Sequence, residues 1–541
     1  MGLRRLFKRS DSAEPESYFN GVEPDPSARP LLFKSQSQEI TSVFLMSLCT
    51  VMSSANQGAI SLALPEMATY FRINGSALSW TISSYSLITG SFILLMARLA
   101  DVFGRKRTVI MSFAWYAAWN LFSAFIHNDI GFDCMRGLQG IAGAAASPAA
   151  AGLLGAVYLD GPRKNMALAT FAAGAPVGYV IGLVVGGICS QFLSFHAIMY
   201  FLAIIYGAAA VLVWITTEAV MRASTGNKWE QLRKLDYLGA LLSTLGLLLL
   251  VFSLTEAAAA PKGWGTPYII AMIIVGIVLL GLFVTWEFYY SNPLMPMFIW
   301  KYPGFALVMV VIACGWIDFQ GVLNYYSSLF FQDIKGYSPI LTTACLCPQA
   351  VMGIIVNIFA GYTLHIISGR ILLLVGMFSF LGSALLWALV PLHLTYWAMC
   401  FPALILCVIG ADLAYNVGNL FVLSTVPPEL KSTAAGIFIT LSQLAQSLGL
   451  AAATSIVASI IGVNQDGLAP ARLLEGFRGA YWFAVGVSGV GVILAFFVRV
   501  GTQGGEHRQI PDNEQELPEK TGDDTSDIVN IDTTTVTEKD S

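Results

Sequence analysis

"ARLADVFGRKRTVI" spans residues Ala97–Ile110 and places one aspartate and four basic residues between two long, almost uncharged stretches. Each flanking stretch has roughly the 20 mostly apolar residues that a helix needs to cross a bilayer. Lys and Arg gather in the cytoplasmic loops of membrane proteins, and Gly104 can adopt the positive φ that ends a helix. The stretch therefore predicts two membrane-spanning helices joined by a tight cytoplasmic loop.

The composition supports a membrane protein. Of the 541 residues, 56% are hydrophobic and only 11% are charged, whereas soluble domains carry about 25% charged residues. A single soluble core does not bury this much apolar surface. We predict that the lipid bilayer surrounds the chain and that no nucleic acid binds it.

Fourteen apolar runs are long enough to cross a bilayer as helices. Only helices and closed barrels satisfy their backbone hydrogen bonds in lipid, and these runs are too long for barrel strands. The sequence therefore predicts an all-α polytopic membrane protein with 14 transmembrane helices. The runs are 40–65, 77–97, 108–127, 135–157, 166–188, 196–216, 237–256, 268–287, 304–331, 340–362, 371–390, 395–424, 432–461 and 479–498.

The distribution of Lys and Arg predicts the orientation. If the amino terminus is cytoplasmic, the cytoplasmic segments before the carboxy-terminal tail carry 19 Lys and Arg, and the outer loops carry 5. This bias places both termini in the cytoplasm. The sequon at Asn74 then falls in the first outer loop and is a candidate glycosylation site.

A weak internal repeat predicts the domain organisation. "GPRKNMALATFAAGAPVGYVIGLVVGG", from Gly161, is similar to "PPELKSTAAGIFITLSQLAQSLGLAAA", from Pro427. The match brings helices 2–5 into register with helices 10–13, as a parallel duplication of six helices with two inserted between the halves would do. Parallel repeats of this kind occur in transporters that bind substrate between the halves. The predicted parts are a disordered cytoplasmic tail (1–39), a six-helix bundle (40–216), a linker with two extra helices (217–303), a second six-helix bundle (304–498) and a disordered acidic cytoplasmic tail (499–541).

Catalytic and metal-binding motifs are missing from the sequence. The eight cysteines lie in or beside apolar runs without a CxxC pair, and the five histidines show no ligand spacing. There is no phosphate-binding loop and no nucleophile elbow. We therefore predict that the protein is not an enzyme and carries no cofactor and no metal.

Two aspartates lie deep inside apolar runs. An ionisable residue at membrane depth costs roughly 2.5–3.5 kcal/mol on insertion scales, so it needs a functional or structural reason. Asp412 starts a stripe with Asn416 and Asn419 on one helix face, and Asp318 lies beside further amides. We predict that both aspartates bind protons or cationic substrate; the alternative is a structural hydrogen-bonding role.

The acid in the opening stretch predicts a conformational switch. Asp101 can accept hydrogen bonds from an Arg or cap a neighbouring helix, and a contact of this kind can hold one closed state. The alternative is a solvated charged loop. The predicted switch residues are Asp101, Gly104, Arg105 and Lys106.

Several motifs resemble those of the major facilitator superfamily. "ARLADVFGRKR" resembles its loop motif G-x-x-x-D-x-x-G-R-K, "RGLQGIAGA" its fourth-helix motif, and "GYVIGLVVGG" its fifth-helix antiporter motif. "ALSWTISSYSLITG" and "SNPLMPMFIWKYPGF" are similar to segments of the fourteen-helix drug:proton antiporter family, and the chain looks closest to the fungal aminotriazole-resistance-like branch. Two positions depart from the family pattern: Asn56 replaces the usual first-helix aspartate, and Leu183 replaces the fifth-helix proline.

The resemblance implies roles for further residues. Arg136 matches an arginine with a part in proton transfer or state-dependent hydrogen bonding; the alternative is an arginine bound to carbonyl groups or to Asp133. The small residues of the fifth helix would pack closely on a partner helix; they are Gly174, Gly178, Gly182 and Gly186. The candidate substrate-binding residues are Asn56, Gln57, Trp80, Tyr85, Gln139, Gln320, Asn324, Asn416 and Asn419.

These features together predict a proton-coupled secondary active transporter that exports small molecules, such as drugs, toxins or metabolites, by alternating access. An importer or uniporter of a small polar solute (ammonium, borate or a siderophore) is the first alternative, and a transporter-like sensor is the second. The expected partners are protons and a small-molecule substrate. We expect a monomer in the plasma membrane, with the vacuolar membrane as the alternative.

Overall fold

The computed structural model describes residues 29–501, except for short gaps and one longer one. The gaps are 31–32, 34, 74–75, 159–161, 217–234, 258–259, 261, 291–292, 365, 428–429 and 463–466. Asn74, most of the predicted amino-terminal tail and nearly all of the predicted carboxy-terminal tail lie outside the described residues.

The described part of the chain is helical and contains no strand, as the sequence predicts. Thirteen helices are long and apolar enough to cross a membrane, and the more polar α3 brings the number to fourteen. The first six are α1 (Gln36–Phe71), α2 (Ser76–Phe103), α3 (Arg105–Ser123), α4 (Asp129–Val157), α5 (Pro162–Phe192) and α6 (Phe195–Thr216). The next two are α8 (Tyr237–Glu256) and α9 (Pro267–Tyr289).

The remaining helices follow a short 3₁₀ turn, η4 (Met297–Lys301). The first of them, Phe305–Ile334, is one continuous span made of four segments. Its segments are α10 (Phe305–Trp316), η5 (Ile317–Leu323), α11 (Asn324–Leu329) and η6 (Phe330–Ile334). The others are α12 (Pro339–Thr363), α13 (Gly369–Leu389), α14 (Cys400–Thr425), α15 (Lys431–Ile461) and α16 (Pro470–Phe497).

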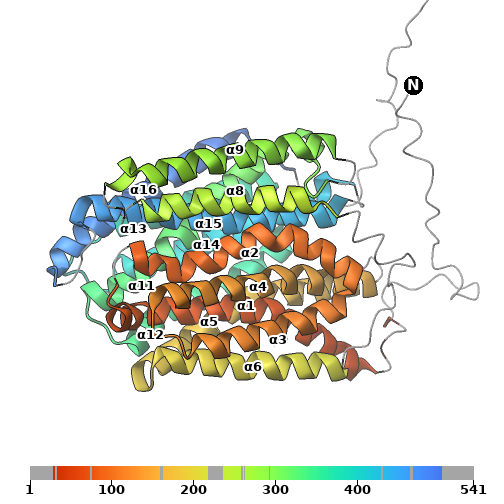
Figure 1. Cartoon of the computed structure of the whole chain (residues 1–541), viewed down its shortest axis with the longest axis horizontal. Helices are drawn as coiled ribbons and strands as arrows, with labels where there is room; N and C mark the ends of the chain where they lie inside the picture. The colour runs from red at the N-terminus through yellow and green to blue at the C-terminus, as the bar shows by residue number, and fades with distance from the viewer. Residues whose placement is uncertain are drawn as a thin grey trace, which may run out of the picture. The chain divides into compact units, whose positions relative to one another are not determined.

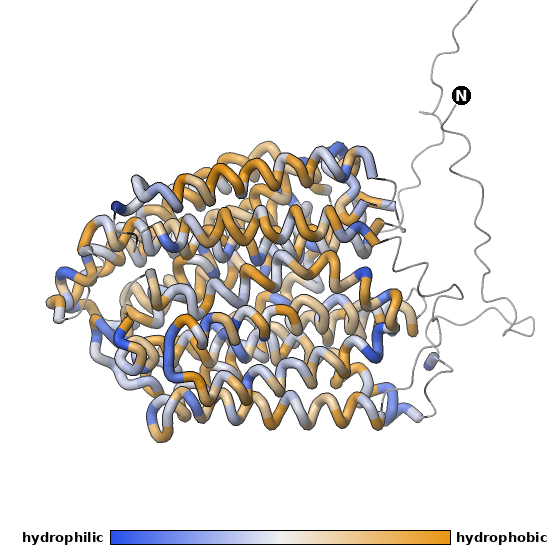
Figure 2. Tube along the Cα trace, in the orientation of Figure 1, coloured by the Kyte–Doolittle hydropathy of each residue, from blue (hydrophilic) through white to orange (hydrophobic). Residues whose placement is uncertain are grey.

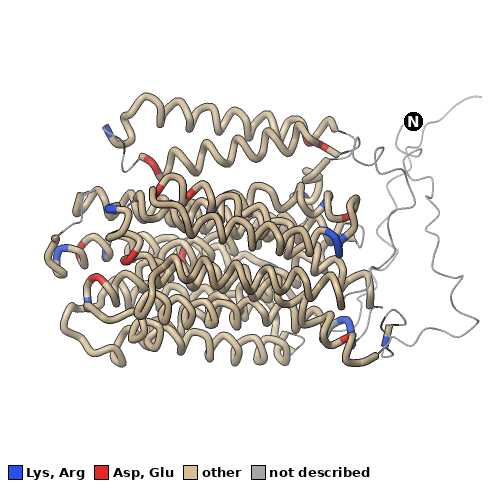
Figure 3. The backbone as a smooth tube through the Cα atoms, turned by 60° about the horizontal axis from the view of Figure 1, so that its bottom comes forward, with Lys and Arg blue, Asp and Glu red and all other residues tan. Residues whose placement is uncertain are grey.

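The helices run side by side (Figure 1), and apolar residues cover most of their length (Figure 2). Charged residues gather mainly at the two ends of the helices (Figure 3). We name these ends by one residue each: the Gly104 end, where α2 meets α3, and the Arg72 end, where α1 meets α2. Several helices extend past the apolar runs, because backbone hydrogen bonding continues where the side chains turn polar. α16, for example, begins at Pro470 rather than at 479.

Gly104 explains the sharp reversal between α2 and α3. Its φ is 101°, a value that side chains with a Cβ rarely adopt. Its amide closes the last turn of α2 on the Ala100 carbonyl, and its own carbonyl accepts the Thr108 amide at 3.0 Å in the first turn of α3. Gly104 therefore ends the hydrogen bonding of α2 and starts that of α3. This is the tight connection that the opening stretch predicts.

Two helices connect the amino-terminal and carboxy-terminal groups of helices. α5 packs along α1 and also contacts α12, whereas α15 packs along η5 and also contacts α2. The predicted duplication pairs α5 with α15 and α2 with α12, so the contact of α5 with α12 corresponds to the contact of α15 with α2. The inserted helices lie to one side, with α8 on α2 and α15 and with α9 on α8 (Figure 1).

The span Phe305–Ile334 is interrupted twice by π-helical turns. Segments η5 and η6 have i→i+5 hydrogen bonding and enclose the regular segment α11. π-Helical turns are rare and occur frequently at functional sites. They also rotate the side chains that follow them relative to a regular α-helix.

Candidate transport site

A cavity of about 250 Å³ lies between the two groups of helices, midway along them. Residues of α1, α4 and α5 form one side, and residues of α10, η5, α12, α14 and α15 form the other. Hydroxyl groups and aromatic rings share its walls with amide side chains. The amides are those of Gln57, Gln320, Gln349, Asn357, Asn416, Gln443 and Gln446.

Asp412 is the only carboxylate among the described residues that line this central cavity, and no Lys, Arg or His lines it. Its Oδ2 is buried and has no hydrogen-bond partner in the described part of the chain. Asn416 lies one turn further along α14 and donates at 2.8 Å both to the Asp412 carbonyl and to Oδ1 of Asn357. The cavity wall therefore carries one carboxylate, which has a buried oxygen without a partner, among neutral hydrogen-bonding groups.

Two aromatic rings lie on the same side of the cavity as Asp412. The Trp316 and Tyr415 rings are 5.5 Å apart with an interplanar angle of 32°, and both side chains line the cavity. Aromatic faces attract cations that come within about 6 Å of the ring centre. This wall can therefore hold a positive charge beside the carboxylate.

Asp318 lies behind the cavity wall rather than on it. It is 0% exposed, and its Oδ2 accepts a 2.9 Å hydrogen bond from Ser488 Oγ of α16. Its neighbours in η5, Phe319 and Gln320, do line the cavity. Asp318 and Asp412 therefore occupy different surroundings, although the sequence predicts one role for both.

Arg136 lies in a buried polar network outside the cavity. Its Nη1 donates to Asn56 Oδ1 at 2.5 Å and to Gln139 Oε1 at 2.7 Å, and its Nε donates to the Thr81 carbonyl at 3.0 Å. The guanidinium also stands 5.1 Å from the centre of the Tyr85 ring. No described carboxylate forms a salt bridge with it. The charge is thus balanced by amides, a carbonyl and an aromatic face.

Only part of the predicted substrate-binding set lines the cavity. Gln57, Gln320 and Asn416 do so. Asn324 lies behind the wall, where it donates to Gln320 at 3.1 Å and accepts from Gln349 at 3.4 Å. The other predicted residues do not line the cavity. Asn56 and Gln139 contact Arg136, and Tyr85 forms a hydrogen bond with Tyr116. Trp80 contacts Glu256 of α8, and Asn419 is not among the lining residues.

The sequence prediction missed several residues that line the cavity. Gln443 and Gln446 come from α15, and Gln349 and Asn357 come from α12. The sequence could have identified these four residues as candidates, because each is an amide inside a long apolar run, as Asn416 is. The internal repeat also gave a signal, since it aligns α15 with α5, whose Pro176 and Tyr179 line the opposite wall.

The predicted switch residues contact α2, α3, α4 and α6. Arg105 bonds to Asp101 Oδ1 through Nε at 2.9 Å and also donates to the Gly152 carbonyl near the end of α4. Lys106 donates to the Trp214 carbonyl of α6 at 3.3 Å. All of these partners belong to the first six helices. Arg98 donates to Thr433 Oγ1 of α15 at 3.5 Å and so joins the two groups at this end.

The four glycines of α5 lie against α1. A Cβ on Gly178 would come within 2.1 Å of the Val51 carbonyl oxygen, and one on Gly182 within 2.2 Å of the Ala55 carbonyl oxygen. Gly174 and Gly186 also approach α1 closely. The two backbones are therefore in direct contact along this seam, and α1 is the partner helix that the sequence left unnamed.

At the Arg72 side of the cavity, hydrogen bonds between described residues join the two groups of helices. One runs from Thr343 Oγ1 of α12 to the Leu183 carbonyl of α5 at 3.1 Å, and two run from the span Phe305–Ile334 to α1. Ser328 Oγ donates to the Ser61 carbonyl at 2.8 Å, and Gln332 Nε2 donates to the Leu62 carbonyl at 3.3 Å. We call these two bonds the gate contacts. On α1 they lie beyond the residues that line the cavity, which run from Thr50 to Gln57. The central cavity therefore lies on the Gly104 side of the gate contacts.

Comparison with known proteins agrees with this arrangement. The family model of the Major Facilitator Superfamily matches residues 46–450. The chain belongs to this superfamily. It is therefore a multi-pass membrane transporter of small molecules rather than an enzyme.

Curated relatives in the superfamily carry different names. The low affinity ammonium transporter of Saccharomyces cerevisiae is 32% identical over 460 residues, which cover 84% of this chain and 87% of that protein. The efflux pump terJ of Aspergillus terreus is 30% identical over 471 residues, covering 86% and 88%. The aminotriazole resistance protein of S. cerevisiae is 25% identical over 471 residues, covering 86% and 85%.

Solved structures agree on the fold. The peptide transporter POT has a TM-score of 0.62 at 15% identity and covers 88% of this chain and 99% of its own. The human organic anion transporter MFSD10 has a TM-score of 0.57 at 13% identity, covering 86% and 100%. These likenesses concern the superfamily fold and not the substrate.

The neutral partner of Arg136 gives a testable prediction about stability. A charge-assisted hydrogen bond to a carboxylate is roughly twice as strong as one to a neutral acceptor. We expect Asn56→Asp to raise the midpoint of thermal unfolding by roughly 2–4 °C, the shift that about 1 kcal/mol produces in a mid-sized domain. Asn56→Leu, of similar size but without an acceptor, should lower the midpoint. A lower midpoint for Asn56→Asp than for the unaltered protein would contradict the idea that a carboxylate beside Arg136 stabilises the fold.

Proposed function

We propose that this transporter exports small cationic or polar molecules in exchange for protons by alternating access. The observation that carries the proposal is the single carboxylate of the central cavity. Asp412 has a free buried oxygen and lies on a wall that carries neutral amides and aromatic rings. A cavity of this chemistry attracts positive charge and offers many hydrogen bonds.

Coupling follows from competition for this carboxylate. A proton and a cationic substrate cannot both neutralise Asp412, so binding of one promotes release of the other. When the cavity opens to the acidic side, the proton displaces the substrate; when it opens to the other side, the substrate replaces the proton. Repeated opening to alternate sides then moves protons and substrate in opposite directions.

The proposed direction rests on the relatives and on the charge bias of the loops. Two curated relatives are named efflux pumps, terJ and terG of A. terreus. The Gly104 end carries the basic loop and is assigned to the cytoplasm. With this orientation, the cavity lies on the cytoplasmic side of the gate contacts. We place the protein in the plasma membrane as a monomer, with the vacuolar membrane as the alternative.

Arg136 and Asp318 receive supporting roles in this proposal. Arg136 joins α4 to α1 and α2 through its hydrogen bonds to Asn56 and to the Thr81 carbonyl. Asp318 joins η5 to α16 through Ser488. Neither lines the cavity, so we assign Arg136 to state-dependent hydrogen bonding and Asp318 to a structural contact. The proton is assigned to Asp412.

Transport by the purified protein in liposomes tests the proposal. We expect an inward-directed proton gradient to drive efflux of organic cations from loaded vesicles at several times the rate seen without a gradient. Dissipating the gradient with a protonophore should remove the stimulation. A panel of radiolabelled cations, neutral polar compounds and ammonium identifies the substrate class. Equal rates with and without the gradient for every compound would contradict proton coupling.

A second candidate function is import or uniport of a small polar solute such as ammonium. The amide-rich wall favours it, since amide oxygens can accept the hydrogen bonds of a small cation. One relative is named an ammonium transporter. This function predicts uptake down the solute's own gradient, without proton exchange. Ammonium uptake that is insensitive to the pH gradient would support it over the exporter.

A further inference from the structure

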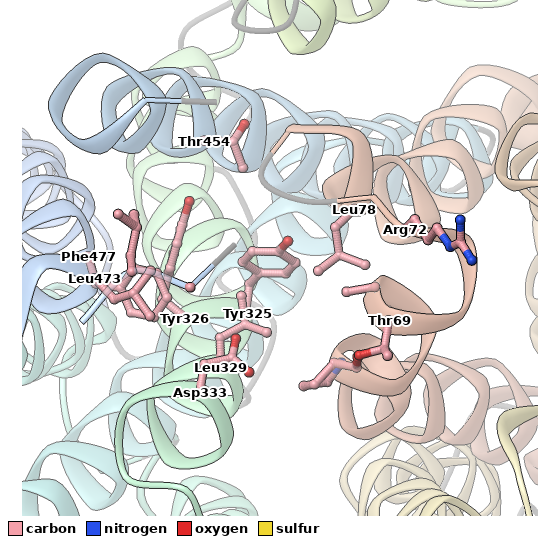
Figure 4. Close-up of a pocket in the computed structure, with 14 residues that line it drawn as sticks. Thr69, Arg72, Leu78, Tyr325, Tyr326, Leu329, Asp333, Thr454, Leu473 and Phe477 are labelled. Atoms are coloured by element: carbon pink, nitrogen blue, oxygen red, sulfur yellow. The ribbon is translucent and has the colours of Figure 1, made fainter. Parts of the chain in front are cut away.

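A second, larger cavity opens at the Arg72 end of the helices. Its volume is about 510 Å³, within the range of roughly 300–1,000 Å³ that small-molecule sites occupy. Thr69 and Leu78 form the wall of α1 and α2, and Tyr325, Tyr326 and Asp333 form the facing wall (Figure 4). We call this cavity the vestibule. It shares no lining residue with the central cavity.

The facing wall combines aromatic rings with one carboxylate. The Tyr325 and Tyr326 rings meet edge to face at 5.0 Å, and the Tyr326 ring meets that of Phe477 at 4.9 Å. Asp333, in the π-helical turn η6, is the only carboxylate among the described residues that line the vestibule. Arg72 is the only Lys or Arg among these described lining residues, and its guanidinium points away from the tyrosine pair (Figure 4). Rings beside a single carboxylate favour an organic cation with a flat apolar part.

The gate contacts lie between the vestibule and the central cavity. Ser328 and Gln332 belong to the same turns of the helix that present Leu329 and Asp333 to the vestibule. Their acceptors, the Ser61 and Leu62 carbonyls, precede the vestibule residues on α1. A molecule in the vestibule therefore contacts both groups of helices on the outer side of a closed gate.

We propose that the vestibule is a second ligand site, which binds an amphipathic organic cation with its charge at Asp333 and its apolar part against Tyr325 and Tyr326. Such a ligand contacts both walls only while α1 and α2 lie close to α11 and α16. Opening the gate moves the walls apart and removes half of its contacts. The ligand therefore stabilises the closed gate and inhibits transport without entering the central cavity.

Ethidium, a rigid aromatic cation, is a suitable probe. Its binding to the full chain in nanodiscs is measured by equilibrium fluorescence. We expect Asp333→Asn to weaken vestibule binding by roughly tenfold, as loss of the charge partner of a cation held by aromatic rings implies. Thr69→Trp fills the vestibule from the opposite wall and should abolish binding there without changing a charge. Asp129→Asn is the matched control, because this carboxylate lies at the same end, outside the vestibule.

A transport assay gives the second readout. Ethidium added on the vestibule side should slow transport of a saturating substrate, and Asp333→Asn and Thr69→Trp should each make transport less sensitive to it. Asp412→Asn should retain vestibule binding. The proposal is overturned if both vestibule variants bind ethidium as the unaltered protein does, or if Asp412→Asn alone removes all binding. These outcomes are independent of proton coupling, which is measured without ethidium.

Discussion

Asp412→Asn is expected to abolish transport driven by a proton gradient. Asparagine has nearly the same size as aspartate and keeps its hydrogen-bonding capacity, so the cavity wall should remain intact. It cannot release a proton, however, and it presents no negative charge to a cation. We expect gradient-driven efflux from liposomes to fall to the rate of protein-free vesicles. Binding of neutral substrates should remain measurable.

The matched control is Asp318→Asn. Both aspartates lie inside apolar helices, but Asp318 is fully buried and bonds to Ser488, whereas Asp412 lines the cavity. An amide at position 318 can keep the contact with Ser488. We expect this variant to retain gradient-driven transport within about threefold, a cost of less than roughly 1 kcal/mol in the barrier. If Asp318→Asn loses coupling and Asp412→Asn keeps it, the proton site lies behind the wall.

The different places of these two aspartates show where the sequence prediction succeeds. Asp412 and Asn416 lie in a regular α-helix, so spacing by four residues predicts that they share a face, and Asn416 does donate to the Asp412 carbonyl. Asp318 lies in η5, where i→i+5 hydrogen bonding changes the number of residues per turn. Gln320, two residues later, lines the cavity. Residues two apart point to nearly opposite sides of either kind of helix, so Asp318 faces away from the cavity.

Long-range packing explains the other differences. The helices themselves were predictable, because length and apolarity decide whether a segment crosses a bilayer. Which helix a polar side chain faces depends on neighbours far away in the sequence. The sequence analysis names Trp80 as a candidate substrate-binding residue, yet its indole nitrogen lies 3.4 Å from Glu256 Oε2 of the inserted α8. Asn56 and Gln139 likewise contact Arg136, and no local pattern predicts that choice.

Gly178→Ala is the second substitution with a large expected effect. The spacing of the α5 glycines predicts close packing on another helix. In the structure, a Cβ added to Gly178 would lie 2.1 Å from the Val51 carbonyl oxygen of α1. That neighbour is backbone, so α1 and α5 have to move apart. Overpacking a well-packed interior typically costs about 1–3 kcal/mol and occasionally more. We expect a cost at the upper end of this range, seen as a clear fall in the midpoint of thermal unfolding and in the yield of monodisperse protein.

Gly486→Ala is the control for helix propensity. Gly486 lies in α16, and a Cβ added there meets no atom within 4 Å. Alanine favours the helix over glycine by roughly 1 kcal/mol, so this variant should be as stable as the unaltered protein or more stable. The two substitutions make the same chemical change in two membrane-spanning helices, and only one of them lies at a backbone contact. Equal midpoints for the two variants would mean that α1 and α5 separate at little cost, and the seam would then be a mobile interface rather than a fixed one.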